Sequence, residues 1–207
     1  MRCADYGARV DHLTVFASHV FVFRNPDSQR LNARLLPLLL AESQATPGLQ
    51  VSNHGGWHSP PDLCQRPPFQ ELMGLFVSRV GSVVRTLSGA RDLPVPELRF
   101  GVQSWAMVMP TGAFTRPHDH ATSPFSLVWY VDGGEPGQGG ELVLMDPRRA
   151  APSIPGLPLD PRELTIRPET GMLVVFPGSL QHWVQPYRGQ RPRVSISANV
   201  GVEVQRA

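Results

Sequence analysis

Eight short apolar runs, separated by glycine and proline, fill the chain after residue 93 and constrain its fold more than any other feature. Each run is rich in β-branched and aromatic residues and is bounded by turn-forming residues, which predicts a β-strand. Eight short strands favour a jelly roll, because two facing sheets can then share one core. The predicted strands span residues 98–109, 115–120, 125–131, 140–145, 163–167, 171–176, 181–186 and 192–202.

The first 93 residues have a different pattern, with fewer turn signals and longer periodic segments. Residues 13–23 are β-branched and aromatic and are predicted to form a strand. Residues 26–43, despite Pro37, and residues 67–87 have helical spacing, and the second helix presents one apolar face. We therefore expect a mainly β fold with flanking helices, in which an N-terminal α/β layer packs on the jelly roll.

The length of the chain favours one domain, because 207 residues suit a single core better than two. We expect one domain of residues 1–207, with an N-terminal layer at 1–93 and a double-stranded β-helix, or cupin-like jelly roll, at 94–207. The glycine-rich residues 132–140 and the proline-rich residues 146–161 are predicted loops.

Charge and composition argue against several classes of partner. The net charge is only +2 and the arginines are scattered, so we expect no nucleic-acid partner. The apolar run at residues 35–41 is too short to span a bilayer, and residues 1–13 lack the apolar core of a signal peptide. With Cys3 and Cys64 predicted to be free thiols, a cytoplasmic protein is the expectation. The absence of lysine excludes Schiff-base chemistry and a P-loop.

The tripeptide "HDH" at the end of a predicted strand is a candidate metal site. Side chains alternate along a strand, so His118 and His120 should share a face while Asp119 points the other way. His182 is the only later histidine and is the candidate third ligand. Asp119 is either an outer-sphere carboxylate or a solvated strand residue.

The last predicted strand carries a second chemical signal. In "RPRVSISANV", Arg193 and Ser195 fall on one face and apolar residues on the other. A guanidinium that faces inward is suited to hold a carboxylate through paired, charge-assisted hydrogen bonds. A surface ion pair at the rim of the jelly roll is the alternative interpretation.

At this point the sequence resembles a known superfamily. "MPTGAFTRPHDH" is similar to the approach to the metal in prolyl-4-hydroxylase-like oxygenases that depend on iron(II) and 2-oxoglutarate. Gly112, Pro117 and His118 match that pattern, whereas His120 stands where an aspartate is expected. The following "VWYVD" resembles a strand whose tyrosine reaches the 2-oxoglutarate carboxylate, which implies this role for Tyr130.

Six segments in register resemble a bacterial and phage family of 2-oxoglutarate- and iron(II)-dependent oxygenases, which often reads H-x-H. They are "SNHGGWHS", "SW", "HDH" followed by "YV", "DPR", "PETGMLVVFPGSLQHWVQPY" and "RVSISANV". The resemblance implies iron(II), 2-oxoglutarate and dioxygen as cofactor and cosubstrates. It also implies His118, His120 and His182 as the catalytic metal ligands, and Arg193, Ser195 and Tyr130 as the 2-oxoglutarate contacts.

The implied reaction is hydroxylation of an unactivated C–H bond in a small molecule or a peptide side chain, with release of succinate and carbon dioxide. The candidate substrate contacts are Asn53, Trp57, His58 and Trp105, and the loop at 147–162 is a further candidate wall. Two alternatives stay open: a three-histidine cupin-like dioxygenase without 2-oxoglutarate, and a non-catalytic jelly-roll binding protein. A homodimer is also a candidate assembly. The sequence leaves open the substrate and the effect of His120 in place of a carboxylate.

Overall fold

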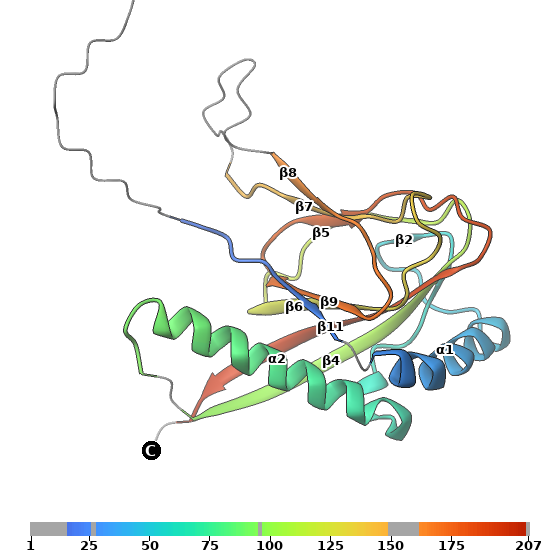
Figure 1. Ribbon diagram of the computed structural model, residues 1–207. Coiled ribbons are helices and arrows are strands. Elements are labelled where there is room, and N and C mark those ends of the chain that lie inside the picture. Colours follow the sequence, from blue (N-terminus) through green and yellow to red (C-terminus); the bar gives the residue numbers. More distant parts are fainter. Residues whose placement is uncertain (1–15, 26–27, 95–96, 149–161, 206–207) are drawn as a thin grey trace, which may run out of the picture.

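The computed structural model describes residues 16–25, 28–94, 97–148 and 162–205. Within these residues two antiparallel sheets face each other and helices lie beneath the larger one (Figure 1). The larger sheet has the strand order β1-β9-β6-β11-β4-β3, and the smaller has the order β2-β5-β10-β7-β8. The strands are β1 Phe21–Arg24, β2 Asn53–His54, β3 Trp57–His58, β4 Leu98–Met109, β5 Phe114–His118, β6 Phe125–Asp132, β7 Leu142–Met145, β8 Glu163–Ile166, β9 Met172–Pro177, β10 His182–Val184 and β11 Arg193–Val204.

This architecture confirms the predicted mainly β, jelly-roll fold with flanking helices. All eight predicted strands after residue 93 are present, with ends displaced by up to two residues. The strands β2 and β3 have two residues each and were not predicted, because so short a segment shows no periodicity. Strands from the N-terminal layer join both sheets, so β2 pairs with β5 while β3 pairs with β4.

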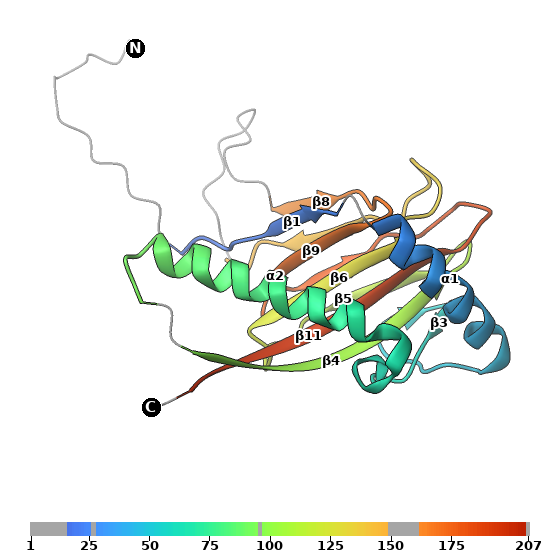
Figure 2. The same ribbon diagram turned by 60° about the horizontal axis from the view of Figure 1, so that its bottom comes forward.

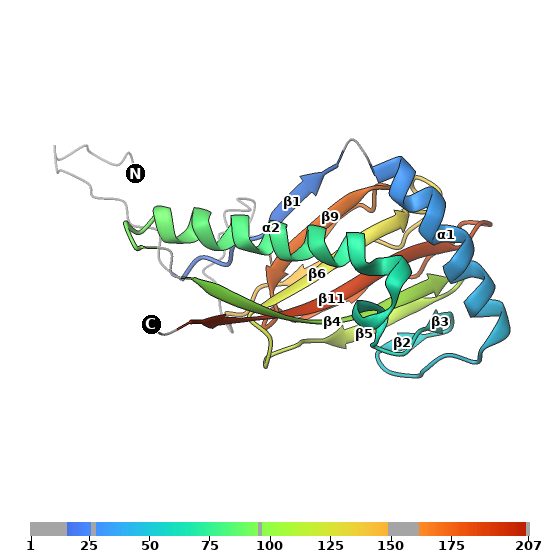
Figure 3. The ribbon, with the colours of Figure 1, turned by 90° about the horizontal axis from the view of Figure 1, so that it is seen from below.

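The helices cover the outer face of the larger sheet (Figures 2 and 3). They are α1 Ser28–Ala45, which contains Pro37, and α2 Gln70–Gly89, preceded by the short 3-10 helices η1 Leu63–Gln65 and η2 Pro67–Phe69. The apolar stripe of α2, including Leu72, Phe76 and Val80, is buried against the sheet. Burial of this stripe is the main favourable contribution to the docking of α2.

A buried polar contact fixes α1 on the sheet. The indole Nε1 of Trp129 donates to Oδ1 of Asn32 at 2.8 Å, and both residues are at most 5% exposed. A buried polar group costs free energy unless it finds a partner, so this pair favours one position of the helix.

Strand alternation divides β4 and β11 between core and cavity. Their even-numbered residues, such as Val108 and Ile196, pack toward the helices. The odd-numbered residues of their inner halves enter the space between the sheets, where Arg193 pairs with Met109 and Ser195 with Met107. The larger sheet therefore supplies the floor of the cavity between the two sheets.

None of the helices in the described part of the chain is long and apolar enough to cross a membrane.

Candidate metal centre

Three histidines converge on the inner side of the smaller sheet. His118 ends β5, His120 follows it by two residues, and His182 begins β10. His182 lies directly opposite His118 in the pairing of these strands. One ligand nitrogen from each residue lies within 4.8 Å of the other two. The structure thus brings together the three histidines named from the sequence.

The position of His120 depends on a turn and not on strand alternation. The predicted strand 115–120 ends at His118, so alternation does not place His120. Instead its backbone N–H donates to the carbonyl of Gly178 at 2.7 Å. The exposed Asp119 accepts a hydrogen bond from the N–H of Ala121 at 3.1 Å, which shapes the turn.

Backbone carbonyls orient two of the rings. Nδ1 of His118 lies 2.7 Å from the carbonyl of Arg116, and Nδ1 of His182 lies 2.8 Å from that of Leu180. A carbonyl only accepts, so each Nδ1 carries the hydrogen and each Nε2 keeps a lone pair for a metal. The His120 ring is held differently, edge-on to the indole of Trp105 with the centroids 5.5 Å apart.

The three imidazoles are neutral near pH 7. Burial, with a smaller contribution from nearby His118, lowers the pKa of His120 and of His182 to about 4. Burial also lowers the pKa of His118 below its ordinary value. Neutral imidazoles are metal ligands, and their donor set suits iron, zinc, copper or nickel. The residues present therefore fit a bound iron(II) ion.

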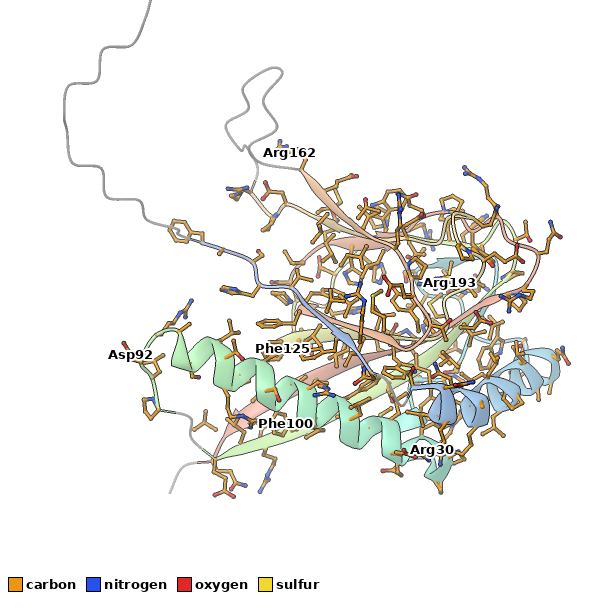
Figure 4. The ribbon with its side chains drawn as sticks, in the orientation of Figure 1. Arg30, Asp92, Phe100, Phe125, Arg162 and Arg193 are labelled. Carbon is orange, nitrogen blue, oxygen red and sulfur yellow. The ribbon has the colours of Figure 1, made fainter. Side chains whose placement is uncertain are left out.

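Arg193, an arginine without a counterion among the described residues, lines the same cavity. Figure 4 labels its position in the fold. Arg193 is 1% exposed, and its Nη1 contacts Sδ of Met109 at 3.2 Å and Oγ of Ser195 at 3.4 Å. The guanidinium carbon lies 4.9 Å from the centre of the Tyr130 ring. No described carboxylate pairs with Arg193, and its Nε has no partner among the described groups.

Tyr130 presents a second unpaired polar group beside Arg193. Its hydroxyl is buried and lacks a hydrogen-bond partner among the described residues. Burial raises the pKa of Tyr130, against the opposing effect of the Arg193 charge, so the hydroxyl keeps its proton. A buried charge and a buried hydroxyl without partners are costly, and a carboxylate ligand would satisfy both. This buried end of the cavity, here called the closed end, thus fits the distal carboxylate of 2-oxoglutarate.

The cavity between the sheets is open to solvent, and the empty space within it and its mouth amounts to about 530 Å³. The predicted residues His118, His120, His182, Tyr130, Arg193 and Ser195 all line it, and so does Trp105. Ser197 and Asn199, which alternation along the strand places on the same face as Arg193, also line it. Ser52 and Ser126 are lining residues that the sequence interpretation missed.

The remaining predicted substrate contacts lie behind the wall. The side chain of Asn53 bonds the carbonyl of Leu49 and the N–H of Val51, and Trp57 Nε1 donates to Oγ1 of Thr46 at 2.9 Å. Neither residue lines the cavity. His58 is buried and stacks on Trp105 with the ring centroids 5.8 Å apart. In the predicted wall at 147–162, residues 149–161 lie outside the described residues.

Ser52 is the missed residue closest to the metal ligands. Its Oγ lies 3.4 Å from Nε2 of His118, the nitrogen that is free to bind a metal. It belongs to the segment that the sequence singled out, but one residue before the predicted contact. A serine in a turn carries no sequence signal of such a role.

Comparison with known families gives a direct assignment. The profile of the family described as "Putative 2OG-Fe(II) oxygenase" matches residues 103–199, which include the three histidines, Tyr130, Arg193 and Ser195. These residues belong to the 2-oxoglutarate/Fe(II) oxygenase family. The protein is accordingly an oxygenase, with iron(II) and 2-oxoglutarate as its cofactor and cosubstrate. No curated protein matches this oxygenase.

Solved structures are similar in fold to the oxygenase, at low sequence identity. A Pseudomonas putida prolyl-4-hydroxylase shares 19% identity, with 91% of this chain and 93% of that chain covered and a TM-score of 0.55. A Trichoplax adhaerens prolyl hydroxylase in complex with a peptide fragment of hypoxia inducible factor shares 16%, with 88% and 83% covered and a TM-score of 0.60. HygX of Streptomyces hygroscopicus, with nickel and 2-oxoglutarate bound, shares 12%, with 89% and 83% covered and a TM-score of 0.57.

Proposed function

We propose that this oxygenase hydroxylates an unactivated C–H bond of a small molecule or a peptide side chain, with release of succinate and carbon dioxide. The observation that carries the proposal is the pairing, in one cavity, of three neutral histidines with a buried arginine that has no counterion among the described residues. A metal centre and a carboxylate clamp in the same cavity are what joint binding of iron and a dicarboxylate requires.

His118, His120 and His182 would hold the iron through the nitrogens that converge in the cavity. The carbonyls of Arg116 and Leu180 keep two of the rings in the tautomer that a metal needs. Iron(II) with 2-oxoglutarate, when bound, supplies the activation of dioxygen that oxidises a C–H bond. The protein provides the fixed ligands and a largely apolar cavity around them.

Arg193, Ser195 and Tyr130 would hold the distal carboxylate of 2-oxoglutarate. The guanidinium has a free Nε and contacts Ser195, so it can present donors in the fork that a carboxylate accepts. Tyr130 lies on β6, opposite Ser195 in the strand pairing, and its protonated hydroxyl is a further donor. Binding of the carboxylate neutralises the buried charge of Arg193.

The metal ligands contribute no negative charge, because His120 occupies the position of the usual carboxylate. The three-histidine site with iron(II) has a formal charge of two plus, which the dianion of 2-oxoglutarate balances. We therefore propose that iron and 2-oxoglutarate bind cooperatively, each raising the affinity of the other. Iron alone should bind more weakly than at a site with a carboxylate ligand.

On the substrate side, Trp105 forms one wall next to His120, and His58 supports that wall from behind. Ser52 offers a hydroxyl beside His118. Asn53 and Trp57 hold the same segment in shape through their hydrogen bonds and do not reach the cavity.

Neither alternative function explains Arg193. A cupin-like dioxygenase without 2-oxoglutarate needs only the histidines, and a binding protein with an empty metal site needs neither group. With either function, no bound group would offset the free energy needed to bury the guanidinium of Arg193. The 2-oxoglutarate clamp gives this charge a role.

An anaerobic titration with iron(II), in the presence and absence of 2-oxoglutarate, tests the proposal. The expected result is a weak visible charge-transfer band that requires both components, followed by succinate release when oxygen is admitted. Intact protein that gives neither the band nor succinate would overturn the proposed function. A band without any hydroxylated product in the presence of candidate substrates would contradict the proposed hydroxylation. It would still support the binding of iron and 2-oxoglutarate.

A further inference from the structure

Strands β4 and β11 continue together beyond the cavity. They pair over twelve residues each, from Arg193 opposite Met109 to Val204 opposite Leu98. Their inner halves form the cavity floor. Beyond Val200, which pairs with Phe125 of β6, the two strands extend past the other strands of the sheet (Figures 1 and 3). Residues 98–103 and 199–204 are here called the outer ribbon.

One face of the outer ribbon belongs to the core. Phe100, Val102, Val200 and Val202 pack in the same cluster as the apolar stripe of α2, and Figure 4 shows Phe100 beside that helix. The other face continues the row that lines the cavity, and its side chains are small or polar. Its residues are Arg99, Gly101, Gln103, Asn199, Gly201 and Glu203.

Two glycines lie directly opposite each other in the middle of this face. Gly101 pairs with Gly201, and neither has a positive φ. A Cβ added at Gly101 would meet no described atom within 4 Å, and one at Gly201 would come no closer than 3.9 Å to a carbonyl oxygen. Glycine weakens a strand, so neither backbone conformation nor packing within the described chain requires these two residues. The pattern is typical of a surface that a ligand approaches closely.

The glycine pair is continuous with the metal centre. The next cross-strand pair inward is Gln103 with Asn199, and the one after it is Trp105 with Ser197. Asn199 lines the cavity, and its Oδ1 accepts a hydrogen bond from Ser126 at 2.9 Å. Each pair is about 6.6 Å further along the strands, so the row from Trp105 to Arg99 covers about 20 Å.

We propose that the outer ribbon docks an extended polypeptide, one side chain of which enters the cavity past Trp105. This inference rests on the proposed function and names the substrate class of the same site. A small molecule held at the metal would have no contact with Gly101, whereas a chain at about 3.3 Å per residue would cross the ribbon with about six residues.

The chemistry of the ribbon favours a peptide over other polymers. Gln103 and Asn199 carry amides, which match the donors and acceptors of a peptide backbone. Arg99 and Glu203 face each other with opposite charges, so this face lacks the basic excess that a nucleic acid requires. Beyond Trp105 the face has no aromatic or aliphatic side chain that would suit a lipid.

Positional peptide libraries provide the probe. Each pool consists of capped dodecapeptides with one fixed central residue and random flanks, and the N-acetyl amide of the same fixed residue is its chain-free counterpart. With iron(II), 2-oxoglutarate and oxygen, at least one pool should raise succinate release above the peptide-free background, and its chain-free counterpart should not. Equal stimulation by the chain-free amide would overturn the proposal in favour of a small-molecule substrate.

Substitutions of Gly101 then test the ribbon itself. Gly101→Ala should reduce the peptide-stimulated succinate release slightly and Gly101→Leu by about tenfold or more, because the larger side chain fills the docking surface. Both variants should keep the peptide-free succinate release and the 2-oxoglutarate dependence of the parent. Thr165→Val, an exposed strand substitution on β8 at the far edge of the smaller sheet, is the matched control and should change none of these.

Other results would contradict either the docking of a peptide on the outer ribbon or the proposed function. If Gly101→Leu keeps full stimulation, or if no pool stimulates a protein that shows the iron and 2-oxoglutarate band, the ribbon does not dock a peptide. A lower thermal midpoint in parallel with the loss of stimulation would show that the glycines serve the ribbon itself. Absence of the band in the intact protein would instead contradict the proposed function, which keeps the two failures apart.

Discussion

The two ends of the cavity lie on the same face of β11 and obey different constraints. At the closed end, Arg193, Ser195 and Tyr130 are at most 2% exposed. At the open end, Asn199 is half-buried and the row continues to the glycine pair on the outer ribbon. The closed end is characterised by a charge and a hydroxyl group that lack partners among the described residues, and the open end by two glycines, which have no side chains.

This difference shows how a strand can serve two ligands. At the closed end, burial of each polar atom costs free energy unless the atom finds a partner. The polar residues there are therefore those that a single carboxylate can pair with. Solvent at the open end makes polar groups inexpensive, so specificity there depends on shape. The metal ligands lie between the two ends, and substitutions can separate the three zones.

The largest effect is expected at the metal ligands, which lie between the two ends of the cavity. His182→Ala should lower iron affinity by more than about 100-fold, because it removes a ligand and not merely a group behind one. The 2-oxoglutarate charge-transfer band should disappear with it. An anaerobic iron(II) titration followed by visible absorption measures both effects.

His54→Ala is the matched control for that variant. His54 lies against Phe114 with the ring centroids 4.6 Å apart and is not part of the histidine cluster. Iron affinity should stay within about twofold of the parent. Equal loss in the two variants would contradict the assignment of the ligands.

A substitution at the closed end should separate the cosubstrate from the metal. Arg193→Met should weaken 2-oxoglutarate binding by about 30-fold or more, which corresponds to a loss of about 2 kcal/mol or more. Iron binding in the absence of 2-oxoglutarate should stay nearly intact, since Arg193 is not a ligand. Isothermal titration with each component in turn measures the split.

The same variant makes an unusual stability prediction. Arg193 is a buried charge without a described counterion, so its replacement by an apolar side chain should leave the free energy of unfolding unchanged or raise it. The parent should gain stability when 2-oxoglutarate and iron are added, and the variant should lose most of that gain. A variant that is strongly destabilised without ligand would show that Arg193 has a structural role.

The sequence predicted the closed end better than the open end for a physical reason. Arginine and serine at alternate positions of an apolar strand are unusual, so Arg193 and Ser195 stand out without any knowledge of the fold. Ser126 and the glycine pair are ordinary residues whose significance comes from their partners across the sheet. Cross-strand register is a tertiary property that a single strand pattern does not contain.

The structure places His120 in the histidine cluster, as the sequence predicted, but strand alternation is not the reason. Alternation along a strand from 115 to 120 grouped it with His118, but β5 ends at His118. The ring reaches the cluster because a turn, fixed by the carbonyl of Gly178, returns it to the cavity. The contact between residues 120 and 178 is long-range, and the local sequence gives no sign of it.

A substitution at this turn should give an intermediate effect. Gly178→Ala would place a Cβ 2.2 Å from the carbonyl oxygen of Ser123 and 2.7 Å from that of His120. The turn must shift, so we expect a loss of about 1–3 kcal/mol in stability and about tenfold in iron affinity. Urea unfolding and the iron titration measure the two effects.

Gly74→Ala provides the control for the size of the added group. Gly74 lies in α2, where a Cβ would meet nothing within 4 Å. It should stabilise the protein by about 0.5–1 kcal/mol and leave iron affinity unchanged. Unchanged iron affinity in Gly178→Ala would mean that the turn does not hold His120 in place.

The smallest effect is expected at Trp57, which tests where the open end stops. Trp57 is buried, and its Nε1 donates to Thr46 at 2.9 Å. Trp57→Phe removes that hydrogen bond but keeps an aromatic ring, so the loss of stability should be about 1 kcal/mol. Iron affinity, 2-oxoglutarate affinity and peptide-stimulated succinate release should all match the parent, because Trp57 supports the wall without lining the cavity. A fall in stimulated turnover with unchanged stability would place Trp57 among the substrate contacts and move the boundary of the open end behind the wall.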